Sequence, residues 1–156
     1  MHVLDLAQGW AYCLDLPDPF GSGPAEGHAL AVSPDGGRLA VADTSSGAVA
    51  YASASTLTIE RVDRIPARAA AASLAYAPDG QRLLLGAGTA VTVLTPAATV
   101  QARWPVPAPV RGLGFSRDGS RVYVGGAEEV RWLDAATGAV RGRAPVEGLT
   151  ALRHVR

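Results

Sequence analysis

Short apolar stretches recur along the chain in pairs, with an Asp-Gly turn between the two members of each pair. The turns read Ser-Pro-Asp-Gly at 33–36, Ala-Pro-Asp-Gly at 77–80 and Ser-Arg-Asp-Gly at 116–119, at intervals of 44 and 39 residues. Proline presets the second turn position, aspartate bonds nearby backbone amides, and glycine adopts the left-handed conformation, so each turn predicts a β-hairpin. The paired strand-like runs are 29–32 and 38–41, 73–76 and 82–85, and 112–115 and 121–124.

Two more strand-like runs follow each hairpin. They lie at 48–51 and 58–62 in the first repeat, 91–94 and 100–104 in the second, and 129–134 and 139–143 in the third. No window combines the spacing of an amphipathic helix with helix caps. Four short strands in each repeat of about 40 residues are typical of a β-propeller blade, so we predict an all-β chain whose blades each contain four antiparallel strands.

The two ends of the chain predict parts of one further blade. Residues 2–9 match residues 131–138, with Asp5 on Asp134 and Gly9 on Gly138, so the chain is expected to begin at a third strand. The predicted units are 1–16 (outer strands of a split blade), 28–66, 72–106 and 111–147 (complete blades), and 149–156 (inner strand of the split blade). An open row of blades would expose apolar faces. We therefore expect either a homo-oligomer, such as two copies closing an eight-bladed ring, or the missing half of a longer propeller.

Composition removes several classes of partner and site. Fourteen arginines balance fourteen acidic residues and lysine is absent, so no nucleic acid or anionic membrane is expected to bind through bulk charge. Cys13 is the only cysteine, which excludes an intrachain disulfide, and it is expected to be a small buried residue. The sequence predicts neither a signal peptide nor a membrane span, because no basic region precedes an apolar stretch and no long apolar run occurs.

The third repeat carries a family resemblance. Residues 122–126, 130–138 and 140–146 resemble the YVTN-type repeat of bacterial propellers. The chain is also similar to WD repeats in period, and Gly27-His28 matches their Gly-His pair, although no Trp-Asp dipeptide ends a third strand. The resemblance implies a seven- or eight-bladed propeller that serves as a binding or scaffolding platform and is only sometimes an enzyme. It favours an extracytoplasmic location if Met1 is not the native start.

Catalytic motifs are not found in the sequence. The three histidines are scattered without the spacing of a zinc site, and neither a phosphate-binding loop with lysine nor Gly-x-Ser-x-Gly occurs. We predict no catalytic residue, metal ligand or cofactor, and a non-catalytic interaction or scaffold module. The alternative is a propeller enzyme of lactonase-like or quinoprotein-related type with its site at the channel mouth.

Loops that differ between repeats are the best candidates for a binding surface, because positions that repeat serve the fold. In a propeller, the connections between second and third strands reach the same rim as those between blades. We expect a mixed polar face there that could hold a protein, peptide or saccharide, although solvated loop tips remain the alternative. Its residues are His28, Asp43, Arg68, Arg111, Glu128 and Glu129. The tryptophans at 10, 104 and 132 are expected to lie between blades.

Overall fold

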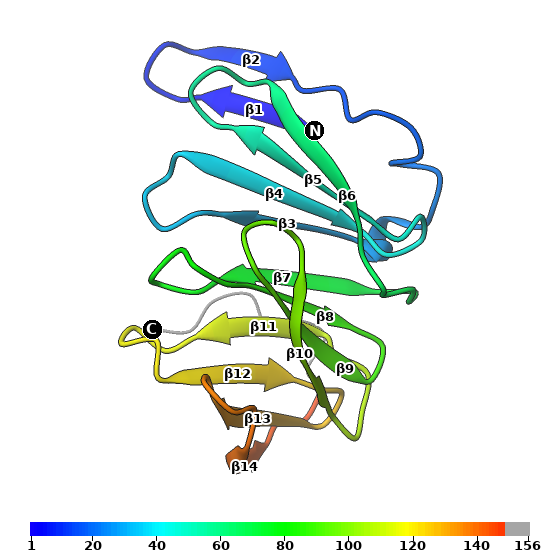
Figure 1. Ribbon diagram of the computed structural model, residues 1–156, viewed down its shortest axis with the longest axis vertical. Coiled ribbons are helices and arrows are strands. Elements are labelled where there is room, and N and C mark those ends of the chain that lie inside the picture. Colours follow the sequence, from blue (N-terminus) through cyan, green and yellow to red (C-terminus); the bar gives the residue numbers. More distant parts are fainter. Residues whose placement is uncertain (149–156) are drawn as a thin grey trace.

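The computed structural model of the chain describes residues 1–148, apart from the side chain of Asp5, and shows β-sheets stacked along its longest axis (Figure 1). Within this range, three sheets have four antiparallel strands and one has two. The first sheet contains β3 (His28–Val32), β4 (Arg38–Asp43), β5 (Ala48–Ser53) and β6 (Ile59–Arg64). The second contains β7 (Ala72–Tyr76), β8 (Leu83–Ala87), β9 (Ala90–Leu94) and β10 (Val100–Pro105). The third contains β11 (Gly112–Phe115), β12 (Arg121–Gly125), β13 (Glu129–Asp134) and β14 (Val140–Pro145).

The Asp-Gly turns form as the sequence predicts. Their glycines have positive φ angles: 73° at Gly36, 69° at Gly80 and 70° at Gly119. In each turn, the aspartate Oδ1 accepts a hydrogen bond from the amide two residues later, at 3.0, 2.9 and 3.1 Å in chain order. Arg117 replaces proline in the third turn without changing this geometry, so the predicted turn mechanism is confirmed.

Acid is expected to weaken the third turn, because Asp118 accepts its hydrogen bonds in the ionised form. The Ser116 hydroxyl, followed by the amide and hydroxyl of Ser120, lowers the pKa of Asp118 from 3.8 to about 2. A depressed carboxyl pKa stabilises the fold above the unfolded-state value, and this contribution is lost as the pH falls from about 4 to about 2. Thermal unfolding over this range should therefore show a smaller loss of midpoint temperature in Asp118→Asn than in the wild type. Asp15→Asn, an exposed control, should behave like the wild type, and three identical curves would contradict the prediction.

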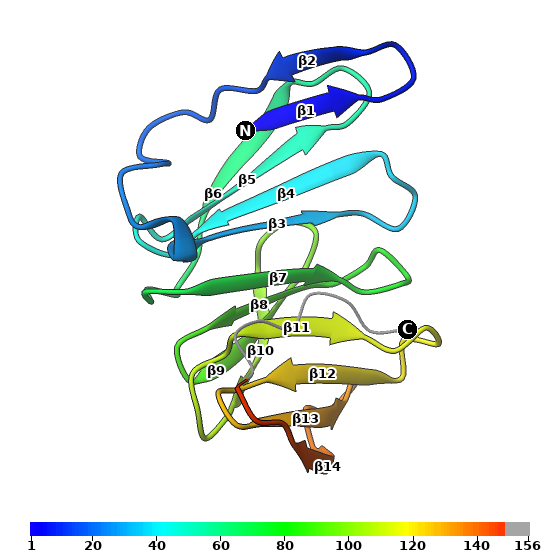
Figure 2. The ribbon, with the colours of Figure 1, turned by 180° about the vertical axis from the view of Figure 1, so that it is seen from behind.

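The four-stranded sheets pack face to face through two apolar clusters. Strand β7 contacts both β3 and β11, so the first strands of the three sheets lie side by side (Figures 1 and 2). Leu83 and Leu85 of β8 belong to the cluster shared with the first sheet, and Leu84 belongs to the cluster shared with the third. Side chains alternate between the faces of a strand, so the second sheet buries apolar side chains on both faces.

The two-stranded sheet, β1 (His2–Asp5) with β2 (Trp10–Cys13), is the partial unit predicted at the start of the chain. Gly9 in its turn has a φ of 71°, close to the 72° of Gly138 in the β13–β14 turn, as the sequence match predicts. Cys13 was expected to be buried, and this is wrong: every residue of β2 is exposed. The predicted inner strand at 149–156 lies outside the described residues.

The connection from β2 to β3 includes one 3-10 turn, η1 (Ala25–Gly27). Among the described residues there is no helix with the length and apolarity needed to cross a membrane.

The tryptophans differ in their surroundings. Trp104 is 7% exposed, and its indole lies against Gly138 of the next sheet, which confirms its predicted place between sheets. Trp132 packs on Gly142, its partner on the adjacent strand of the same sheet. Trp10 is 41% exposed on the two-stranded sheet, so the prediction is wrong for this residue. An aromatic residue in a strand is buried only where another sheet covers its face, which the strand pattern alone does not reveal.

Candidate functional site

His28 and Asp43 face each other at the end of the first sheet, where they form a register pair between β3 and β4. The His28 Nε2 lies 3.4 Å from the Asp43 Oδ2, and the two side chains are 25% and 0% exposed. The other ring nitrogen of His28, Nδ1, lies 3.1 Å from the Pro24 carbonyl oxygen. Each ring nitrogen of His28 thus lies beside an oxygen atom, one of the Asp43 carboxylate and one of the main chain.

Asp43 also holds the turn between β4 and β5. Its Oδ1 accepts hydrogen bonds from the amides of Ser45, at 2.8 Å, and Ser46, at 3.2 Å. Burial by itself would raise the pKa of Asp43, but the Ser46 and Ser45 hydrogen bonds, together with nearby His28, lower it below its ordinary value. The carboxylate is therefore ionised at neutral pH and is directed at the turn and at His28, away from solvent.

Arg68 and Thr44 attach the connection between the first two sheets to the same turn. Arg68 Nη1 donates a hydrogen bond to the Ser45 carbonyl at 3.0 Å, and Thr44 Oγ1 donates one to the Ala69 carbonyl at 2.8 Å. The structure thus brings His28, Asp43 and Arg68, three of the six predicted rim residues, together around one turn.

The other three predicted residues belong to the third sheet. Glu129 forms an ion pair with Arg131, and its Oε2 lies 3.9 Å from the Arg143 Nη1. Glu128 is exposed, and its main-chain oxygen accepts a hydrogen bond from the Val146 amide at 2.8 Å. The Arg111 amide donates to the Gly125 carbonyl at 2.8 Å, which places Arg111 beside the end of β12.

A groove of about 480 Å³ adjoins the third-sheet residues. Its lining is formed by Ala108, Ala127, Glu128, Glu129, Arg143 and Pro145. Acidic and basic side chains thus lie beside an apolar surface, an arrangement that can hold a chain segment by hydrogen bonds and apolar contact. The six predicted residues therefore form two groups, one at the β4–β5 turn and one around this groove.

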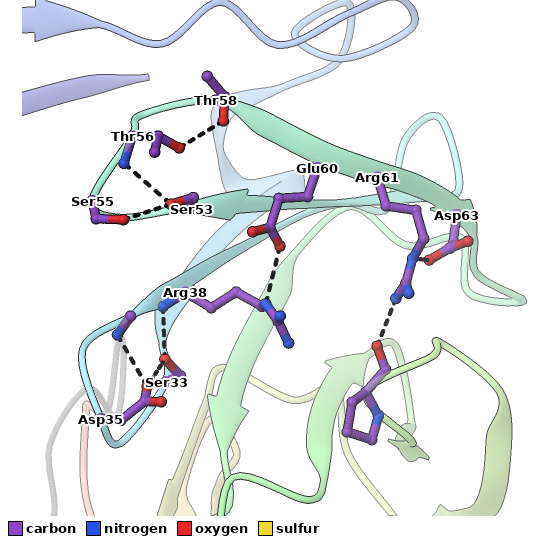
Figure 3. A network of polar contacts seen from close by, with 12 residues as sticks. Ser33, Asp35, Arg38, Ser53, Ser55, Thr56, Thr58, Glu60, Arg61 and Asp63 are labelled. Carbon is purple, nitrogen blue, oxygen red and sulfur yellow. Dashed lines mark hydrogen bonds and ion pairs between the residues drawn. The ribbon is translucent and has the colours of Figure 1, made fainter.

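Sequence analysis overlooked a polar cluster at the opposite ends of the first two sheets, around Arg38 and Tyr76. Figure 3 shows the contacts of Arg38. The signal that could have revealed it is the presence of Tyr51 and Tyr76 at positions where the following repeats have Val93 and Phe115. Among residues 1–148, no three His, Cys, Asp or Glu side chains with described positions are grouped so that they could hold a metal ion.

Comparison with known proteins identifies the architecture. No protein-family model matches the sequence, and no curated protein is found to be similar to it. Among solved structures, Kuenenia stuttgartiensis hydrazine synthase is similar with a TM-score of 0.70 and 18% identity, over 88% of this chain and 42% of that chain. The WD40 repeats of RRP9 are similar with a TM-score of 0.62 and 16% identity, over 78% and 39% of the two chains. Saccharomyces cerevisiae Sqt1 gives 0.63 and 16%, over 79% and 36%.

The chain has a WD-repeat-like β-propeller fold. At these identities the similarity concerns the fold alone, and the chain spans about two fifths of the length of the structures that it matches. The three four-stranded sheets are complete blades, and β1 with β2 is a partial one. The β4–β5 and β12–β13 turns lie on one rim of the propeller, and the Asp-Gly turns lie on the other (Figure 1).

Proposed function

We propose that this propeller chain is a non-catalytic interaction module that binds a peptide segment of a partner protein in the groove beside Glu128. The observation that carries the proposal is the pairing of charged side chains in this groove. Glu129 is engaged by Arg131, whereas the Glu128 carboxylate forms no hydrogen bond or ion pair with the described residues. An available carboxylate next to the apolar surface of Ala108 and Pro145 suits a basic side chain flanked by apolar residues.

Peptide selection against the purified protein tests this proposal. We expect selected peptides to be enriched in arginine or lysine, and Glu128→Ala to weaken the best of them about tenfold, the loss of one charge-assisted hydrogen bond. Glu26→Ala removes another exposed carboxylate, on η1, and should bind with wild-type affinity. Arg111→Ala replaces a second charged residue of the same rim. Unchanged affinity in both Glu128→Ala and Arg111→Ala would exclude this rim as the binding surface.

Assembly through the partial blade is a second part of the proposal. Within residues 1–148, β1 pairs with β2 alone, and the hairpin exposes large apolar side chains: Leu4 (65%), Leu6 (91%), Trp10 (41%) and Tyr12 (48%). Burial of such surface is favourable, which supports either a homo-oligomer or pairing with the remainder of a longer propeller. Light scattering distinguishes the two, because a homo-oligomer gives a multiple of 16.0 kDa and a monomer excludes it.

The enzymatic alternative, a lactonase-like or quinoprotein-related propeller, is separated from binding by direct assay. Bound metal found by elemental analysis, together with hydrolysis across a panel of lactones, would contradict the non-catalytic proposal.

A further inference from the structure

A second cavity lies on the other rim, between the first and second blades. Its volume is about 620 Å³, within the range of roughly 300–1,000 Å³ that is usual for small-molecule sites. Asp-Gly turns from both blades form its walls, and Figure 3 shows the polar contacts on the first-blade side. The polar side chains in its lining include Asp35, Arg38, Glu60, Tyr76, Asp79 and Gln81.

Arg38 departs from the role of its counterpart in the next repeat. Both Arg38 and Arg82 stand three residues after the turn aspartate. Arg82 Nη1 donates a hydrogen bond to the Ala135 carbonyl in the β13–β14 turn of the following blade. The equivalent carbonyl for Arg38 is that of Pro96, but Arg61 Nη2 already donates to it at 2.6 Å.

Arg38 is therefore available to a ligand. Its Nε donates to the Glu60 Oε2 at 3.2 Å, while its two terminal nitrogens form no hydrogen bond with the described residues (Figure 3). The side chain is 49% exposed. A guanidinium group with two unused nitrogens presents several donors to the cavity.

Two tyrosines distinguish this interface from the next one. Tyr51 and Tyr76 belong to facing blades, and the hydroxyls of both are buried without a hydrogen-bond partner among the described residues. The corresponding side chains between the second and third blades are Val93 and Phe115, which have no polar atom. An unpartnered buried hydroxyl costs about 1–3 kcal/mol, so the first interface carries polar groups that its packing does not require.

Tyr76 lines the cavity and is a neutral donor. Burial, followed by the neighbouring Tyr51, raises the pKa of Tyr76 to about 12, although Arg38 opposes this shift. Its hydroxyl therefore keeps its hydrogen at physiological pH, and because this oxygen is buried, the side chains over it must shift before it donates to a ligand oxygen.

The charges around the cavity determine the class of ligand. Three carboxylates lie around the cavity, those of Asp35, Glu60 and Asp79. Only two guanidinium groups balance them: that of Arg38, and that of Arg82, whose Nη2 lies 3.7 Å from the Asp79 Oδ2. Excess negative charge disfavours an anion. Donors and acceptors in similar number suit hydroxyl groups, which donate and accept at once.

Proline rings supply the apolar part of the lining, through Pro34, Pro78 and Pro96. Such rings can contact the C–H faces of a sugar ring while polar side chains bind its hydroxyls. We propose that this cavity binds a neutral polyhydroxylated molecule, a mono- or disaccharide, with Arg38 and Tyr76 as donors and Asp35 and Asp79 as acceptors.

Saturation-transfer NMR with glucose, galactose, mannose, N-acetylglucosamine and maltose tests the proposal. We expect at least one of these sugars to bind. Arg38→Gln should raise the dissociation constant of the bound sugar about tenfold. Tyr76→Phe, which removes only the unpartnered hydroxyl, should raise it about fivefold. Arg121→Gln changes the equivalent arginine of the third blade, outside the cavity, and should leave binding unchanged.

Three results would overturn the proposal. They are the absence of binding by all five sugars, equal affinity of the wild type and the Arg38→Gln and Tyr76→Phe variants, and binding of acetate or inorganic phosphate in place of sugar. Tyr76→Phe should fold as the wild type does, since it leaves the ring in place, so a loss of binding in this variant does not come from unfolding. The peptide groove lies on the other rim, so either site can fail without affecting the other.

Discussion

Replacement of Asp43 by alanine is expected to lower the free energy of unfolding by about 3 kcal/mol. The substitution removes a fully buried carboxylate that accepts two amide hydrogen bonds and faces His28 at 3.4 Å. The amides of Ser45 and Ser46 would then be left in a partly buried site without their acceptor, and His28 would lose the carboxylate beside its ring. Urea denaturation monitored by tryptophan fluorescence measures the change.

Asp79→Ala is the matched control for this prediction. Asp79 also holds a turn, but it accepts one amide hydrogen bond, from Gln81, and its side chain is 52% exposed. Its replacement should cost less than about 1 kcal/mol. Equal losses in the two variants would show that the buried environment of Asp43 contributes nothing beyond the turn itself.

Replacement of Gly138 by alanine is expected to cost about 3 kcal/mol as well, for a steric reason. The new Cβ would lie 2.3 Å from the Trp104 Cδ1, so the buried indole of the second blade would have to move. The φ of 72° adds a conformational penalty of about 1–2 kcal/mol for a residue with a Cβ. Thermal and urea unfolding should both show the loss.

Gly36→Ala separates these two contributions. Gly36 has nearly the same φ, 73°, but a Cβ there would meet nothing within 4 Å. This variant should show only the conformational penalty, about 1 kcal/mol. If Gly138→Ala were no more destabilising than Gly36→Ala, the packing of Trp104 on Gly138 would not be tight enough to exclude a Cβ.

Turn chemistry made the strands predictable from the sequence. Asp35, Asp79 and Asp118 bond amides within their own turns, so the hairpins follow from short sequences without reference to the rest of the fold. The strands extend at most two residues beyond the predicted runs at their ends, as β4 does to Asp43. Pairing across strands can continue after the apolar pattern stops.

The candidate sites were less predictable, because they depend on contacts between blades. Nothing local indicates that Asp43 is fully buried beside His28, or that Arg61 takes the Pro96 carbonyl and leaves Arg38 available. The predicted rim residues lie in or beside loops that interrupt the repeat, and their role in binding stays a prediction. The tyrosine pair also interrupts the repeat, but it lies within the strands β5 and β7 and not in the loops.

The leucines of β8 have a consequence for how the second blade selects its strand alignment. Leu83, Leu84 and Leu85 are each fully buried, so a shift of this strand by one residue would still place leucine on both faces. In a strand with one polar face such a slip exposes apolar side chains and is thereby excluded, but β8 lacks this safeguard. The alignment of β8 with β7 must instead come from the length and geometry of the hairpin turn at 77–80, where Gly80 adopts a φ of 69°. In a strand whose residues are all buried, a four-residue turn decides which leucine faces which blade.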